Sequence, residues 1–121
     1  MPETTDTSPN VFPEGRYKLT IKKVPLKKKT EKGNTFYEFD FEGVVDGETK
    51  GFKGFFWPSE SRELLLAIGG KPDSADPKKI TWEREEAQGK AIEATVYHVP
   101  QRKDPSRVDV KLKEITEAVP F

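Results

Sequence analysis

The chain has 121 residues, of which 33% are hydrophobic and 35% charged, and its formal net charge is zero. This length predicts one domain with a modest core, and the longest apolar run, residues 64–68, is far too short to span a membrane. Zero cysteines and a single histidine exclude disulfides, thiolate metal sites and catalytic triads, so we expect a cytoplasmic protein with no cofactor.

Residues 1–13 are threonine-, serine- and proline-rich, without periodicity or the apolar segment of a secretory signal. We expect a flexible N-terminal tail there. From Gly15 onward, Tyr17, Leu19 and Ile21 alternate with polar residues, which predicts a strand buried on one face. The folded domain is expected over residues 14–116, followed by a short C-terminal tail at 117–121.

The charges of the next segments are segregated along the chain. Residues 22–32 contain six lysines and one glutamate, whereas residues 38–48 contain five carboxylates and no lysine. We predict that residues 27–34 form a loop. The acidic segment belongs to the hairpin that follows.

Asp46-Gly47 is a two-residue hairpin signal between two runs rich in strand-forming residues. Counting outward from this turn gives the register of both strands. One face pairs Phe41 with Phe52, Phe39 with Gly54 and Tyr37 with Phe56; the other pairs Asp40 with Lys53, Glu38 with Phe55 and Phe36 with Trp57. Phe36, Phe55 and Trp57 are therefore predicted on the polar face.

Pro58 ends the second strand of the hairpin, and Ser59 or Ser61 can cap a short helix through Ile68. Residues 80–82 suggest an extended piece and residues 83–88 a helical turn. Alternation over residues 92–97 and 108–113 predicts the last two strands. This order is typical of an all-β OB-fold, a five-stranded Greek-key barrel with a helix between its third and fourth strands.

In an OB-fold the ligand lies across the second and third strands, between the loops that join strands one to two and four to five. Both of these loops are basic in this chain. Cations neutralise phosphates and aromatic rings stack on unpaired bases, so this pattern favours binding of single-stranded nucleic acid. The predicted contact residues are Lys22, Lys27, Lys28, Lys29, Lys32, Phe36, Lys53, Phe55, Trp57, Arg102, Lys103 and Arg107.

Short glycine-centred motifs give the chain a family resemblance. They are Pro13-Glu14-Gly15-Arg16-Tyr17, Lys32-Gly33-Asn34, Val45-Asp46-Gly47, residues 64–69 and Gln88-Gly89-Lys90-Ala91. Over roughly residues 12–116 the layout resembles the small OB-fold single-stranded DNA-binding proteins of phages and prophages. The resemblance implies a role in DNA replication or recombination in a bacterial host cell, and it implies no catalytic residues.

Such proteins often end in an acidic tail that finishes in Pro-Phe and docks on partner enzymes. Pro120 and Phe121 match the tip, but the acidic run is missing. A terminal strand capped by a packing aromatic is the alternative for this end. DNA and RNA are not distinguished by the residues of the predicted face.

Other interpretations remain open for the same residues. The lysines can simply keep a sheet edge soluble, and the aromatic face can bind a polypeptide or a second subunit, which would make the chain a protein-interaction module. Trp82 is expected to be a packing anchor and His98 a polar residue at a strand end. Asp40 with Glu48-Thr49-Lys50 echoes a nuclease metal site, but the hairpin register separates Asp40 from Glu48 by roughly 17 Å. We therefore expect no enzyme activity.

Overall fold

The computed structural model describes residues 2–5 and 11–118, and this part of the chain is mostly β. Its strands are β1 (Gly15–Ile21), β2 (Leu26–Lys29), β3 (Thr35–Val45), β4 (Glu48–Phe56), β5 (Lys71–Pro72), β6 (Ile80–Thr81), β7 (Ala91–Pro100) and β8 (Val108–Glu117). A 3-10 turn, η1 (Pro58–Glu60), precedes helix α1 (Arg62–Ala67), and helix α2 (Arg84–Ala87) follows β6. Each helix described is far too short and polar to cross a bilayer.

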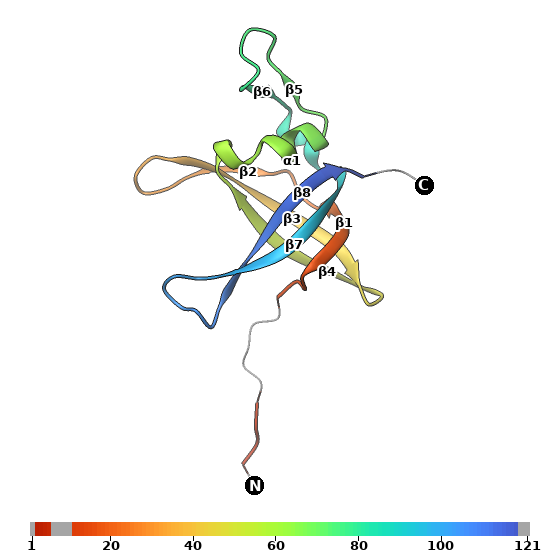
Figure 1. Ribbon diagram of the computed structural model, residues 1–121, viewed down its shortest axis with the longest axis vertical. Helices are drawn as coiled ribbons and strands as arrows, with labels where there is room; N and C mark the ends of the chain where they lie inside the picture. The colour runs from red at the N-terminus through yellow and green to blue at the C-terminus, as the bar shows by residue number, and fades with distance from the viewer. Residues whose placement is uncertain (1, 6–10, 119–121) are drawn as a thin grey trace.

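The main sheet is antiparallel and has the order β2-β3-β1-β7-β8, with β4 paired to β3 (Figure 1). Strand β3 pairs with three other strands. It pairs with β4 along most of its length, while β2 and β1 pair with successive parts of its other edge. Strands β5 and β6 form a separate small hairpin that projects beyond α1 (Figure 1).

The hairpin register predicted from the Asp46-Gly47 turn is confirmed. Every predicted pair from Val45–Glu48 to Tyr37–Phe56 is present in the β3–β4 ladder. Asp46 and Gly47 both have positive φ, 51° and 81°, as a type I′ turn requires. Strand β4 ends at Phe56, however, so the ladder stops before the predicted Phe36–Trp57 pair; on the other edge of β3, Phe36 pairs with Lys28 of β2.

The core lies on the predicted faces of β1, β3, β4 and β7. Leu19, Ile21, Phe39 and Ile92 are completely buried. Further residues of the predicted inward face, including Tyr17, Tyr37, Phe52, Val110 and Leu112, are partly buried and pack against the core. Tyr37 and Phe56 therefore face inward, as the register predicts.

Two expectations about the strands need correction. Residues Leu26–Lys29 form an edge strand and not a loop, because their backbone pairs with residues 35–38 of β3 while the lysine side chains stay exposed at the sheet edge. The short strands β2, β5 and β6 raise the number of described strands above five, whereas the helical turn predicted at residues 83–88 is present as α2.

The folded part also begins earlier than residue 14. Phe12 is only 3% exposed and packs its ring against Tyr17 and Phe52, with both ring centroids 4.9 Å away. The backbone oxygen of Phe12 lies 2.6 Å from Nε2 of His98. Because Phe12 lies directly before Pro13 and outside any alternating pattern of apolar residues, the sequence alone could not assign it to the core.

Candidate nucleic-acid interface

Phe36, Phe55 and Trp57 form an aromatic cluster on the outer face of β3 and β4, the face opposite the core. The ring centroids of Phe55 and Trp57 each lie 6.0 Å from that of Phe36. Phe55 is 54% exposed and Trp57 42%, whereas Phe36 is half-buried between them. The cluster therefore exposes two rings to solvent, and the third packs between them.

Glu38 lies beside this cluster and is nearly buried, with 8% of its surface exposed. Its Oε2 is 3.1 Å from Nζ of Lys28, and its Oε1 is 3.8 Å from Nζ of Lys53. Glu38 thus lies on the predicted polar face of the hairpin, but its carboxylate is not solvated there. Burial of a carboxylate requires charged partners, and the two lysines supply them.

The segregated charges of the sequence meet in space. Strand β2 brings Lys28 against Glu38, and Lys23, which follows β1, lies 3.7 Å from Asp40. The acidic segment thus neutralises part of the lysine-rich segment. The positive charge left for a ligand is smaller than the run of six lysines suggests.

The register of β2 divides its three lysines between two faces. Lys28 is opposite Phe36 and shares the outer face, whereas Lys27 and Lys29 are opposite Tyr37 and Thr35 and belong to the other face. Lys22 follows β1, where its backbone nitrogen donates to the oxygen of Asp40 at 2.8 Å. Of the predicted lysines, Lys28 and Lys53 are the two that the structure brings to the aromatic cluster.

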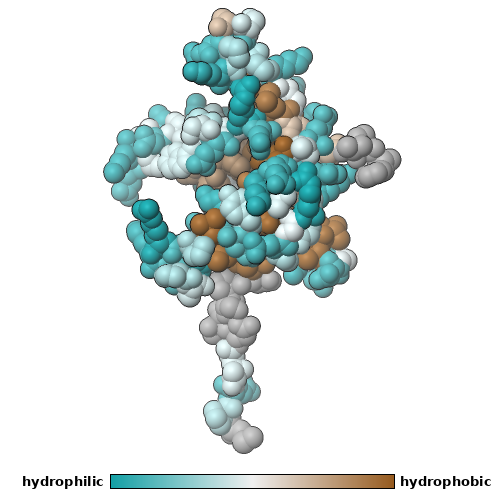
Figure 2. All heavy atoms as spheres, viewed as in Figure 1, coloured by the Kyte–Doolittle hydropathy of each residue, from teal (hydrophilic) through white to brown (hydrophobic). Residues whose placement is uncertain are grey.

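The two basic loops project from the same side of the molecule (Figure 1). One is the turn between β2 and β3, which carries exposed Lys32 and is closed by a 2.9 Å hydrogen bond from the nitrogen of Thr30 to the oxygen of Asn34. The other joins β7 to β8 and carries exposed Arg102 and Lys103. Figure 2 shows two hydrophilic lobes on this side with open space between them.

The β7–β8 loop is fixed by Asp104. The hydroxyl and the backbone nitrogen of Ser106 donate to Oδ1 of Asp104 at 2.5 and 3.2 Å, and Arg107 lies 3.6 Å from Oδ2. The hydrogen bonds from Ser106, followed by the charge of Arg107, hold the pKa of the Asp104 carboxyl below its ordinary value. Arg107 is therefore engaged within its own loop.

A hollow of about 300 Å³ opens beside the aromatic cluster. It is lined by Thr30, Phe36, Phe55, Phe56, Trp57 and Lys111. Sequence reasoning missed Thr30 and Lys111. Lys111 alternates with the partly buried Val110 and Leu112 of β8, as any surface lysine would, and only the tertiary structure places it across from β4.

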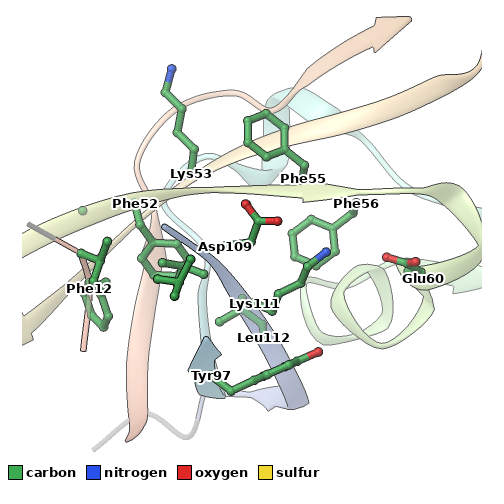
Figure 3. Close-up of a pocket in the computed structure, with 15 residues that line it drawn as sticks. Phe12, Phe52, Lys53, Phe55, Phe56, Glu60, Tyr97, Asp109, Lys111 and Leu112 are labelled. Atoms are coloured by element: carbon green, nitrogen blue, oxygen red, sulfur yellow. The ribbon is translucent and has the colours of Figure 1, made fainter. Parts of the chain in front are cut away.

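A second, larger groove of about 590 Å³ lies between β4 and β8. Figure 3 shows Phe52 and Phe56 on one side of β4, Lys53 and Phe55 on the other, and Lys111 pointing from β8 toward β4. Among the residues described, β4 pairs only with β3 and β8 only with β7. The two strands thus face each other without a shared ladder.

Several secondary interpretations can be compared with the structure. Trp82 is a packing anchor, as predicted, with its ring 5.3 Å from Tyr37 and 6.0 Å from Phe39. His98 lies within β7 and contacts Phe12, so its predicted place at the strand end is wrong. Across residues 2–5 and 11–118, no cluster of three histidine or acidic side chains could hold a metal ion. Pro120 and Phe121 lie outside the described residues.

The sequence matches no protein-family model and no curated protein.

Proposed function

We propose that this protein is a non-enzymatic single-stranded DNA-binding protein with little sequence preference. The observation that carries the proposal is the exposed aromatic cluster, flanked by lysines and by two basic loops on one side of the molecule. Solvent-exposed rings at this density mark a binding surface of some kind. Rings bordered by cations suit unstacked bases joined by phosphates.

The strand arrangement supports an OB-fold for this protein. With the short strands set aside, β1, β3, β4, β7 and β8 are the five strands of the predicted order, and β1 lies between β3 and β7 as a Greek-key barrel requires. Strands β4 and β8 would be the pair that completes the barrel. In that fold the outer face of β3 and β4 is the ligand-binding face. A role in phage DNA replication or recombination is the biological setting we propose for this activity.

Binding would combine two physical contributions. Phe55 and Trp57 stack on bases, each contact contributing about 1–3 kcal/mol, and this energy hardly depends on base identity. Lysines and arginines on the loops release counterions from the phosphates, which makes affinity fall with salt. Because Lys28 and Lys53 share the charge of Glu38, we expect a modest salt dependence and a large contribution from stacking.

Trp57→Ala tests the proposal in a Trp82→Phe background, where Trp57 is the remaining tryptophan. Short oligo-dT should quench the fluorescence of Trp57 in the parent protein. The alanine variant should lose roughly ten- to hundred-fold in affinity, as one stacking contact implies. Its melting temperature should stay close to that of the parent, because Trp57 is exposed and outside the core.

A parent protein that neither binds oligo-dT at low salt nor shows quenching would overturn the proposal. The pairing of Lys23, Lys28 and Lys53 with acids favours a second candidate in that case, a protein-interaction module whose aromatic cluster receives a polypeptide or another copy of the chain. Light scattering of wild type and Trp57→Ala would then show whether the cluster holds subunits together.

A further inference from the structure

Lys111 of β8 is the cation that lines the hollow beside the aromatic cluster, although β8 was not part of the predicted binding face. The same side chain lines the groove between β4 and β8, so it stands where the two cavities meet. Figure 3 shows it reaching from β8 toward β4. A ligand in the hollow would therefore contact both edges of the sheet.

The charges around the hollow are asymmetric. Its lining includes Lys111, Thr30 and aromatic side chains, but no carboxylate among the residues described. The larger groove is lined by the acidic side chains of Glu60 and Asp109 as well as by Lys53 and Lys111, so its charges balance. An anion near Lys111 is thus more favoured on the side of the aromatic cluster than on the side of the groove.

Lys111 also differs from the lysines that the hairpin supplies. Lys28 and Lys53 both lie within 4 Å of the Glu38 carboxylate, and one negative charge is shared between them. Within residues 2–5 and 11–118, Lys111 has no acidic side chain at ion-pair distance. Its charge is the least compensated of those that border the aromatic cluster.

Building on the proposed function, we propose that the hollow is a subsite for one nucleotide, in which Lys111 binds the phosphate. The base stacks on Phe55 and Trp57, and the hydroxyl of Thr30, which accepts from the backbone nitrogen of Asn34 at 3.2 Å, can donate its proton to the base edge. The single strand then crosses from the outer face of β3 and β4 onto β8, and does not end at the hairpin.

Lys111→Met tests this subsite, with Lys113→Met as the matched control. Both lysines are exposed and share one face of β8, but Lys113 lies over the ring of Tyr97, 5.2 Å from its centroid, and does not line the hollow. Lys111→Met should weaken oligo-dT binding several-fold and reduce the log-log salt slope by up to about 0.7, the contribution of one phosphate contact on a single strand. Lys113→Met should leave both unchanged, and Lys111→Arg should retain binding.

The outcomes separate this inference from the proposed function. If oligo-dT quenches Trp57 but Lys111→Met keeps wild-type affinity and slope, the subsite is wrong and the proposed function stands. If Lys111→Met and Lys113→Met lose the same amount of oligo-dT affinity, the subsite is also wrong, because the loss would then reflect only the net charge of β8. A wild-type protein that binds no oligonucleotide would remove both. Circular dichroism and the melting temperature confirm that each variant folds, and Lys111→Gln replaces Lys111→Met if that variant does not.

Discussion

At the scale of single residues, the burial of Glu38 decides what its carboxylate does in the fold. In the sequence it is one of five acids in a segment without lysine, which suggests a solvated strand face. In the fold, Phe55 and Leu26 are its neighbours across the sheet, and they leave it only 8% exposed. The carboxylate therefore holds Lys28 and Lys53 in place beside the aromatic cluster.

Gly54 is a residue whose small size the packing of the core requires. A Cβ at this position would lie 2.9 Å from the ring carbons of both Phe41 and Phe56. Phe41 is buried in the core and Phe56 nearly so, and neither ring can move without disturbing its neighbours. Glycine in the middle of a strand is here a consequence of close approach.

We predict that Gly54→Ala lowers the free energy of unfolding by about 1–3 kcal/mol, the usual range for overpacking a core. Urea unfolding followed by circular dichroism measures the effect. Thr49→Ala is the control, because Thr49 lies on the same strand but is exposed, and it should stay within about 0.5 kcal/mol of wild type. Equal stability of Gly54→Ala and wild type would show that the rings do not pack as described.

At the scale of elements, the pairing of β2 with β3 divides a lysine-rich run between the two faces of the sheet. This pairing directs Lys28 to the outer face and places Lys27 and Lys29 on the other. A loop would not impose this alternation, since its side chains follow no fixed period. The contribution of the three lysines to binding should therefore be unequal.

Under the proposed function, Lys28→Ala should weaken oligo-dT binding more than Lys27→Ala and Lys29→Ala combined. The expected change in salt slope is up to about 0.7 for Lys28 and close to zero for the other two. Fluorescence titrations at several salt concentrations measure both quantities. A larger loss from the double variant would mean that β2 presents its opposite face to the ligand.

The β7–β8 loop allows a prediction about pH. Asp104 has a pKa below its ordinary value of 3.8, so the ionised form stabilises the folded loop at higher pH. This contribution is fully present above the ordinary pKa and is lost as the pH falls through the depressed pKa of the folded state. The loop should therefore keep its structure at neutral pH and loosen only in acid.

Ser106→Ala should raise the pKa of Asp104 toward its ordinary value, because the hydroxyl of Ser106 is the main donor to the carboxylate. An NMR titration of the Asp104 carboxyl carbon follows this change. Ser59→Ala, a change at an exposed serine in η1, should leave the pKa of Asp104 where it is. If Ser106→Ala also leaves it unchanged, the hydrogen bond does not form in solution.

At the scale of the whole molecule, local sequence signals predicted the β3–β4 hairpin. The strand at β2 and the position of Lys111 depend on long-range contacts. The Asp46-Gly47 turn gave the register and hence the outward position of Phe55 and Trp57. The edge strand β2 was missed because three consecutive lysines have low strand propensity, and only pairing with β3 orders them. Lys111 could not be predicted as part of the site, because its place depends on how β8 lies against β4.

The unpaired edge of β4 has a consequence for hydrogen exchange. In a two-residue type I′ hairpin the residues that flank the turn are hydrogen-bonded to each other, and such pairs alternate along the ladder. Counting outward from the hydrogen-bonded pair Val45–Glu48, the backbone amides of Phe52 and Gly54 donate hydrogen bonds to β3. The amides of Lys53 and Phe55 point the other way, toward the groove beside β8. No backbone acceptor for these two amides occurs in the described part of the chain.

Deuterium uptake along β4 should therefore alternate from one residue to the next, with Lys53 and Phe55 exchanging faster than Phe52 and Gly54. Amide-resolved NMR of the unmodified protein would show this alternation. Any ligand that occupies the groove and shields this edge should slow Lys53 and Phe55 alone, so β4 reports occupancy of the groove without a mutation or a label. Uniform protection along β4 in the free protein would instead mean that its second edge is already paired.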